Sequence, residues 1–468
     1  MGAVTTQTVP SLDFTPATAA DMAFIAETIE RLRLDGERLA PEQFITLRRD
    51  GRIIAFGRIK PYEKTYELGS VAVIEEERSR GLGEQMTREL IRRFPQDEVY
   101  ITTDLPVYYE RLGFLRTEFL PQELVDKLER VKAAKLREDP VGMVYDRRIE
   151  QLPTIADVYR ARRLLEPHLR RTPLIRNPAM SRELGFEAWL KLENLQPIGA
   201  FKVRGGVYLS ASMTEEERSH GIIGASTGNH GQSLAYGAKL AGIKCTIVMP
   251  EEANPMKVES MRALGAQVLF HGANFEEARE WAEEHAASEG VQYIHHSNAP
   301  RLIAGVATMS LEIVEDLPDV DVILVAVGGG SGALANIIVA KQLRPNVEVI
   351  GVQAAGAPAV YESWKSHTLR AAGIDTAAEG LATGAAYHPA LRTMIDHLDD
   401  FVLVSEEEIR GAMLLLARGA HVIAEEAGAA ATAGAVQLQK RLAGKNVAII
   451  VSGGNVPLDH LRRVLLEA

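Results

Sequence analysis

Residues 191–206 read Lys191-Leu-Glu-Asn-Leu-Gln-Pro-Ile-Gly-Ala-Phe-Lys-Val-Arg-Gly-Gly206, and this stretch decides the fold. Pro197 and Gly199 interrupt the strand-like residues before them, because both residue types favour turns. Lys202 therefore follows a turn, at the expected mouth of a sheet. Burial at such a place lowers the pKa of a lysine amine, which suits Schiff-base formation with a carbonyl compound.

Three more segments place polar residues and glycines directly after a strand-like run. They are Ala225-Ser-Thr-Gly-Asn-His-Gly-Gln232, Ala326-Val-Gly-Gly-Gly-Ser-Gly-Ala333 and Ser452-Gly-Gly-Asn455. Open α/β sheets bind ligands at the carboxyl ends of their strands, so these loops are expected at such edges. In the second segment, glycines let the backbone wrap an anion at a helix N-terminus. It lacks the lysine of a nucleotide-binding P-loop, which weakens that alternative.

Short apolar runs alternate with amphipathic stretches after about residue 150. Near-continuous apolar strands separated by helices predict a parallel sheet covered on both faces. A helix is expected over residues 275–285, whose apolar positions share one face. The predicted strands are residues 188–192, 221–225, 245–249, 267–270, 320–327, 347–352 and 447–451.

The sequence before residue 150 has a different rhythm. A helix is expected over residues 19–34, and two strands are expected around the Asp50-Gly51 turn. The charged, helix-prone stretch 120–148 is interrupted by Pro140-Val-Gly142 and is expected to close this region. We therefore predict two domains, residues 1–148 and 149–468.

The four segments of the second region resemble the serine/threonine dehydratases, which are pyridoxal-phosphate (PLP) enzymes of the tryptophan-synthase-β fold. The resemblance runs from about Tyr159 to the end of the sequence. It implies two open parallel-sheet α/β subdomains with PLP between them. In this family Lys202 would hold the cofactor, Asn229 would contact its ring hydroxyl, and Ser452 would face its pyridine nitrogen.

The resemblance also implies the remaining contacts to cofactor and substrate. The phosphate cup would consist of Gly328, Gly329, Gly330, Ser331 and Gly332. The substrate carboxylate would be held by Ser226, Thr227, Gly228 and His230.

The chemistry implied by this resemblance is β-elimination from threonine or serine, giving a 2-oxo acid and ammonia. A neutral hydroxyl such as that of Ser452 does not keep the pyridine nitrogen protonated, which favours elimination over transamination. The freed Lys202 amine would remove the Cα proton. Thr227 stands where racemases of this fold carry serine, and Val203 where β-replacement enzymes usually carry aspartate, so both of those activities are disfavoured.

Departures from the family pattern leave the substrate open. The family often has serine at Ala200, Phe-Asp at Ser297-Asn298, Gly-Gln-Gly-Thr at Gly305-Val-Ala-Thr308, and aspartate at Glu379. Gln353 stands where metal-activated relatives carry glutamate, so no divalent cation is expected there.

The first region resembles the GNAT-type N-acetyltransferases, a mixed-sheet fold. The carrying residues are Arg78-x-x-Gly81-x-Gly83 and the later Tyr108-Tyr-Glu-Arg-Leu-Gly-Phe114. The resemblance implies that Arg78, Gly81 and Gly83 bind the pyrophosphate of acetyl-CoA at a helix N-terminus. Tyr109 either protonates the departing thiolate or only packs. The sequence shows no acceptor signature and leaves acetylation, sensing of acetyl-CoA and a role in assembly open.

The composition of the chain argues against some classes of binding partner. A net charge of −11 argues against a nucleic-acid-binding surface, and no apolar run is long enough to span a bilayer. The single cysteine, Cys245, fits a reducing compartment, so a cytoplasmic enzyme acting on a small amino acid is expected. Self-association as a dimer or tetramer is expected from the resemblance.

Overall fold

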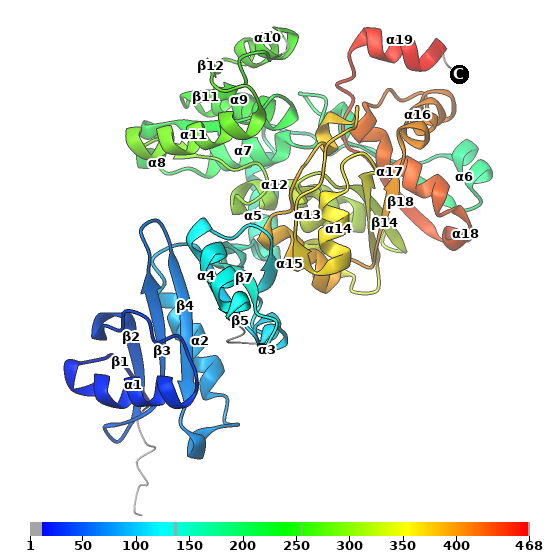
Figure 1. Cartoon of the computed structure of the whole chain (residues 1–468). Coiled ribbons are helices and arrows are strands. Elements are labelled where there is room, and N and C mark those ends of the chain that lie inside the picture. The colour runs from blue at the N-terminus through cyan, green and yellow to red at the C-terminus, as the bar shows by residue number, and fades with distance from the viewer. Residues whose placement is uncertain (1–11, 135–137, 254, 467–468) are drawn as a thin grey trace, which may run out of the picture. The chain divides into compact units, whose positions relative to one another are not determined.

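The computed structural model describes residues 12–134, 138–253 and 255–466 and divides into two compact units (Figure 1). The first unit is Met1–Glu150 and the second is Gln151–Ala468. Each has its own buried apolar clusters.

The first unit is a mixed sheet with the order β1-β2-β3-β4-β5-β7-β6. The strands around Asp50-Gly51 pair antiparallel, as predicted, whereas β4 and β5 run parallel. Apolar side chains of α1 and α2 pack in two separate clusters against the sheet strands. Its elements are β1 (Leu12–Pro16), α1 (Met22–Arg31), β2 (Phe44–Arg49), β3 (Arg52–Pro61), β4 (Tyr66–Val73), α2 (Leu82–Arg93), β5 (Glu98–Thr103), α3 (Pro106–Arg111), β6 (Leu115–Thr117), α4 (Gln122–Ala133) and β7 (Val141–Asp146).

The end of this unit differs from the sequence-based expectation. The residues Pro140-Val-Gly142 are not a simple break after a helix, because Val141 begins the buried strand β7. This strand pairs antiparallel with β5 along six positions from Glu98 to Thr103. Pairing with a distant strand therefore overrides the local turn tendency of proline and glycine.

The second unit contains two sheets. The smaller one has the order β12-β11-β10-β13 and is parallel throughout, and the larger one has the order β17-β15-β14-β18-β9-β8. In the larger sheet only the edge pair β8–β9 is antiparallel among the described strands. The predicted α/β architecture of mainly parallel sheets is confirmed.

The elements of the second unit follow in chain order. They are α5 (Ile155–Leu165), β8 (Leu174–Arg176), α6 (Pro178–Leu184), β9 (Glu187–Leu192), α7 (Val203–Ser212), α8 (Glu215–His220), β10 (Ile222–Ala225), α9 (Asn229–Ala241), β11 (Cys245–Met249), α10 (Pro255–Ala263), β12 (Gln267–Phe270), α11 (Phe275–Glu289), β13 (Gln292–Tyr293), α12 (Pro300–Asp316), β14 (Val322–Ala326), α13 (Ser331–Leu343), β15 (Glu348–Ala354), α14 (Ala359–Ser366), β16 (Thr368–Leu369), α15 (His388–His397), β17 (Asp400–Val404), α16 (Glu406–Leu415), α17 (Glu426–Gln437), α18 (Gln439–Leu442), β18 (Asn446–Val451) and α19 (Leu458–Leu466).

Helices cover both faces of the smaller sheet, as the apolar strands predict. Cys245, Ile247 and Met249 of β11 pack with α9 and α10, while the intervening Val248 packs with α11. Alternation along a strand sends neighbours to opposite faces, so a strand buried on both sides must be apolar throughout. Figure 1 shows this sheet in green, with its helices on either side.

Glycines bring the helix that follows Lys202 against its neighbour. A Cβ at Gly206 of α7 would lie 2.0 Å from the Ser233 carbonyl oxygen, and one at Gly237 of α9 would lie 2.2 Å from the Gly206 carbonyl oxygen. Since no side chain fits there, α7 and α9 pack backbone to backbone. This contact ties Lys202 to the loop that begins α9.

Among the described residues, no helix combines the length and apolar character needed to cross a membrane.

Candidate active site

Lys202 lies immediately before α7, in a segment that is bound to the end of β18. Ala200 forms a bridge with Gly453, and the Phe201 amide donates to the Ser452 carbonyl at 3.0 Å. Gly199 has a φ of 69°, a conformation that glycine adopts without strain. The chain therefore turns at Gly199 and places Lys202 beside Ser452.

The Lys202 amine reaches the glycine loop. Its Nζ donates to Ser331 Oγ at 2.7 Å and lies 3.4 Å from the His296 carbonyl oxygen. Burial lowers the pKa of this amine to about 8, so a large fraction is neutral near pH 8. A neutral amine is the form that attacks a carbonyl carbon.

Gly328, Gly329 and Gly330 lie in the loop that joins β14 to α13, and Ser331 and Gly332 are the first residues of this helix. A Cβ at Gly328 would lie 2.5 Å from the Gly380 carbonyl oxygen, and one at Gly329 would lie 2.1 Å from Ser297 Oγ. Ser297 Oγ is buried and has no hydrogen-bond partner in the described part of the chain. The loop therefore offers backbone N–H groups, a helix N-terminus and a spare hydroxyl to an anion.

The loop after β10 lies on the smaller sheet. Ser226 Oγ accepts from the Gly228 amide at 3.2 Å and from the Gly231 amide at 2.9 Å, which fixes the turn that contains Thr227. His230 is buried, and burial lowers the pKa of its imidazole to about 3, so the ring is neutral.

Asn229 belongs to a chain of polar side chains. Its Oδ1 accepts from Asn455 Nδ2 at 2.8 Å, and its Nδ2 donates to Glu425 Oε1 at 2.7 Å. Burial raises the pKa of Glu425 to about 7. Ser452, in the segment that ends at Asn455, donates its hydroxyl to the Ala427 carbonyl oxygen at 3.2 Å. The structure thus links the three predicted loops to one another and to Lys202.

Three groups of this site were not singled out from the sequence. Glu425 belongs to none of the segments quoted above, and Asn455 was only the end of one of them. His296 is half-buried and stacks on His295 at 4.6 Å between ring centroids. A glutamate that opens an alanine-rich helix was the one local signal for Glu425.

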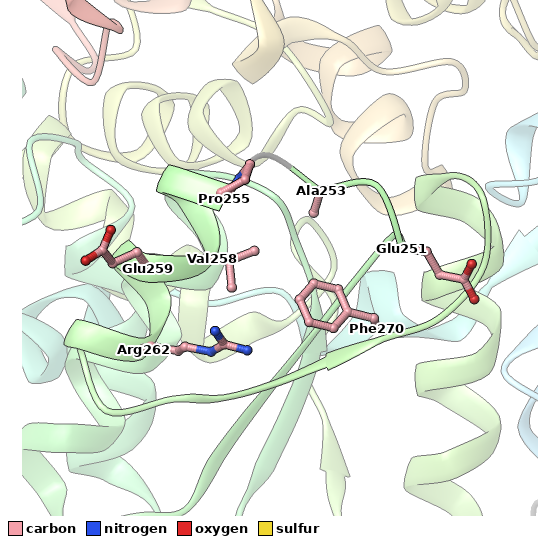
Figure 2. Close-up of a pocket in the computed structure, with 7 residues that line it drawn as sticks. All are labelled: Glu251, Ala253, Pro255, Val258, Glu259, Arg262 and Phe270. Carbon is pink, nitrogen blue, oxygen red and sulfur yellow. The ribbon is translucent and has the colours of Figure 1, made fainter.

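A separate hollow of about 640 Å³ lies over α10 and β12 in the second unit (Figure 2). Glu251 and Glu259 contribute carboxylates, Arg262 contributes a guanidinium, and Val258 and Phe270 supply apolar surface. None of the polar groups around Lys202 is among the described residues that line it. We therefore assign no catalytic function to this hollow.

The predicted acetyl-CoA residues lie between β4 and α2 of the first unit. Gly81, with a φ of 75°, directly precedes α2, and a Cβ at Gly83 would lie 3.0 Å from the Tyr108 hydroxyl. Arg78 is partly exposed, and its Nε donates to the Val73 carbonyl at 3.3 Å. Tyr109 is buried and packs edge-on against Tyr108, with ring centroids 5.0 Å apart.

Comparison with known proteins matches two separate parts of the chain to two families. Residues 165–453 match the family of pyridoxal-phosphate dependent enzymes, and residues 14–114 match the acetyltransferase (GNAT) family. An L-threonine ammonia-lyase of Thermotoga maritima is 41% identical over 314 residues, which are 67% of this chain and 78% of that relative. A catabolic L-threonine dehydratase of Staphylococcus aureus is 39% identical over 318 residues, 67% of this chain and 92% of the relative.

Solved structures also resemble the chain. The processed form of threonine deaminase isoform 2 from Solanum lycopersicum has a TM-score of 0.64 at 29% identity, covering 67% of this chain and 92% of its own. Maize serine racemase has a TM-score of 0.64 at 28% identity, covering 67% of this chain and 97% of its own.

Proposed function

The chain belongs to the pyridoxal-phosphate-dependent enzyme family, and we propose that its second unit is an ammonia-lyase that converts threonine or serine into a 2-oxo acid and ammonia. The contact of the Lys202 amine with Ser331 carries this assignment, because it brings a partly neutral lysine to an anion-binding loop. The names of the curated relatives support threonine as the first substrate to test.

The residues around Lys202 fit the family's cofactor. The close approaches at Gly328 and Gly329 would be lost with any side chain there, and Ser297 Oγ is left for a phosphate oxygen. Lys202 would hold the aldehyde, and Ser452 would face the ring nitrogen. When bound, pyridoxal phosphate supplies an electron sink for the negative charge left at Cα.

The side chains and backbone of the protein have separate roles in proton transfer, substrate binding and cofactor orientation. The freed Lys202 amine accepts the Cα proton, because burial lowers its pKa to about 8 and so makes the neutral form available near this pH. Ser226 holds its loop in place, so that the backbone around Thr227 and Gly228 binds the substrate carboxylate. Asn229, held between Asn455 and Glu425, has a fixed amide orientation toward the ring hydroxyl.

Replacing the lysine tests this function directly. We expect purified protein to release 2-oxobutyrate and ammonia from threonine, and Lys202→Ala to lower kcat by at least about a thousandfold. Borohydride reduction should fix the cofactor to the peptide that contains Lys202, as seen by mass spectrometry. Lys244→Ala, which changes an exposed lysine, is the control. A reduced cofactor on another lysine would overturn the assignment.

The departures at Ala200 and Ser297 favour one further candidate for the same site. A smaller or more polar residue there changes the space beside the substrate, so β-replacement on another amino acid is the second candidate. It predicts incorporation of an added thiol in place of 2-oxo acid release. Full release of 2-oxo acid from threonine alone would exclude β-replacement.

Self-association and cytoplasmic location are further parts of this proposal. The single cysteine of the chain supports the location, and light scattering of the purified chain tests for a dimer or tetramer.

A further inference from the structure

The first unit contains a small cavity, and Tyr109 is the one described residue lining it for which the sequence predicted a role. Strands β4 and β5 pair through Glu67 and Tyr100. Beyond this pair, Gly69, Ser70 and Val71 of β4 and residues 101–103 of β5 line a cavity of about 80 Å³. The two strands therefore have a hollow between them, rather than a continuous ladder.

The backbone at the edge of this cavity is irregular. The pairing of β3 with β4 shifts register between Phe56 and Arg58, and Ser70 has a φ of 46°. Ser70 Oγ donates to the Asp35 carbonyl at 3.2 Å. A non-glycine residue in this conformation is uncommon, and such residues cluster at functional sites.

Charged side chains line the cavity in equal numbers of each sign. Lys127 Nζ donates to Asp35 Oδ2 at 2.7 Å and to Glu67 Oε2 at 2.7 Å, and Lys60 Nζ donates to the same Asp35 oxygen at 2.9 Å. The three cations are Arg58, Lys60 and Lys127, and the three carboxylates are Asp35, Glu67 and Asp104.

These charges are buried as well as paired. The side chains of Arg58 and Glu67 are 1% and 3% exposed, and that of Asp35 is 13% exposed. Although burial raises it, Lys127 and Lys60 hold the pKa of Asp35 well below its ordinary value, so this carboxylate stays ionised. A buried charge is costly unless it is paired, and a ligand that enters must replace each pair it breaks.

A small zwitterion meets this requirement. Its carboxylate can take over hydrogen bonds from Lys60 or Lys127, while its ammonium takes the place of those lysines at Asp35 or Glu67. A polycation or a dicarboxylate would instead leave groups of one sign unpaired. The size and the charge balance of the cavity therefore fit a free α-amino acid.

We propose that this cavity is the acceptor site of an acetyltransferase, and that its acceptor is the amine of a free α-amino acid. The acetyl donor is acetyl-CoA, the substrate class of the GNAT family. The amine nitrogen forms a bond to the thioester carbonyl carbon, and the carbon–sulfur bond breaks. The ammonium loses two protons, of which one goes to the departing thiolate and one to solvent. Tyr109 lines the same cavity and is the group that returns the proton to the thiolate.

The test measures thiol release from acetyl-CoA by the full-length holoenzyme with a panel of acceptors. Amino acids without a β-hydroxyl group, such as alanine and glutamate, avoid consumption by the lyase. We expect amino-acid-dependent thiol release and an N-acetylamino acid by mass spectrometry. Spermidine and amino acids already blocked at nitrogen should give none.

Variants locate the activity in the cavity. Lys127→Met should raise KM for the amino acid by at least about tenfold, because it removes the cation shared by Asp35 and Glu67. Lys127→Arg should restore part of this loss. Arg116→Met removes a partly exposed ion pair of the same unit and is the matched control.

Other results overturn the proposal. They are preference for a polyamine, absence of thiol release with every amino acid, and an unchanged KM in Lys127→Met. A separate assay of 2-oxo acid release from threonine by the same protein preparations reports on the second unit, so failure of the lyase assignment leaves this test intact. A thermal unfolding scan of each variant separates loss of the site from loss of the fold.

Discussion

In the site proposed for the second unit, the protonation state of Lys202 sets the pH at which the protein captures its cofactor. Burial lowers the pKa of the amine from 10.5 to about 8, so the neutral form dominates above pH 8. The rate at which cofactor-free protein develops the visible absorbance band should rise about tenfold from pH 7 to pH 9 and then level off. A rate that keeps rising toward pH 10 would show that the amine is not buried in this way.

The pKa of Glu425 is shifted upwards, whereas that of Lys202 is shifted downwards. Burial, with a smaller contribution from the charges of Glu426 and Glu379, raises the pKa of Glu425 from 4.5 to about 7, although the hydrogen bond from Asn229 and the charge of Lys257 oppose the rise. A carboxyl whose pKa is raised on folding contributes stability that is complete below pH 4.5 and is lost as the pH passes 7, amounting to about 3 kcal/mol.

Glu425→Gln keeps an oxygen that accepts from Asn229 and removes this titration. We therefore expect the variant of the cofactor-free protein to gain stability relative to the parent between pH 5 and pH 8. Thermal unfolding midpoints of the variant and the parent, measured at pH 5 and at pH 8, test this expectation. A difference between the two proteins that does not change with pH would contradict a raised pKa at this carboxyl.

At the scale of elements, the effect of an alanine substitution in residues 328–332 depends on which glycine is changed. A Cβ at Gly328 would lie 2.5 Å from the backbone oxygen of Gly380, whereas one at Gly332 would lie no closer than 3.6 Å to any neighbour. Gly328→Ala should weaken pyridoxal phosphate binding by at least about tenfold, a change of about 1.4 kcal/mol. Gly332→Ala should change it less than about threefold. Equal losses in the two variants would mean that the close approach at Gly328 is unimportant.

A buried ion network fixes α7 to α12 behind Lys202. Arg204 donates to both oxygens of Glu193 and of Glu312, and Lys191 Nζ donates to Glu312 at 2.5 Å. Arg204→Met leaves two buried carboxylates with one lysine, so it should cost about 3–5 kcal/mol. Arg171→Met, which removes partly exposed pairs with Glu315 and Asp316, should cost at most about 1 kcal/mol.

Tryptophan fluorescence is the suitable probe for this pair, because Trp189, Trp281 and Trp364 are the chain's three tryptophans and all belong to the second unit. Urea unfolding followed in this way reports the unit that holds the network. Equal destabilisation by both variants would contradict the importance of burial.

Strands that are apolar throughout were predicted well from the sequence. The boundaries of β11 agree with the predicted residues 245–249, because burial on both faces leaves a nearly continuous apolar run. Those of β12 agree with the predicted residues 267–270, although both ends of this strand are exposed. Strand β7 was missed, since its pairing with β5 has no local signal. Glu425 and Asn229 illustrate the same limit at the site, because 196 residues separate these hydrogen-bonded partners.

At the scale of the whole molecule, each unit has the buried core that independent folding requires. Leu47, Met86 and Leu90 anchor one cluster in the first unit, while the second unit holds its own clusters around β11 and β18. The polar groups assembled around Lys202 all come from the second unit. The chemistry assigned to this site therefore needs no residue of the first unit.

A chain of residues 151–468 should accordingly fold and release 2-oxo acid from threonine with a kcat within about twofold of the full chain. Acetyl-CoA should leave the rate of both proteins unchanged, because the acetyl acceptor site and the lysine site belong to different cores. A rate that responds to acetyl-CoA only in the full chain would instead make the first unit a sensor of the lyase, since coupling between two sites requires that a ligand of one change the equilibrium of the other. Parallel assays of the two proteins, with alanine-dependent thiol release expected only from the full chain, distinguish these arrangements.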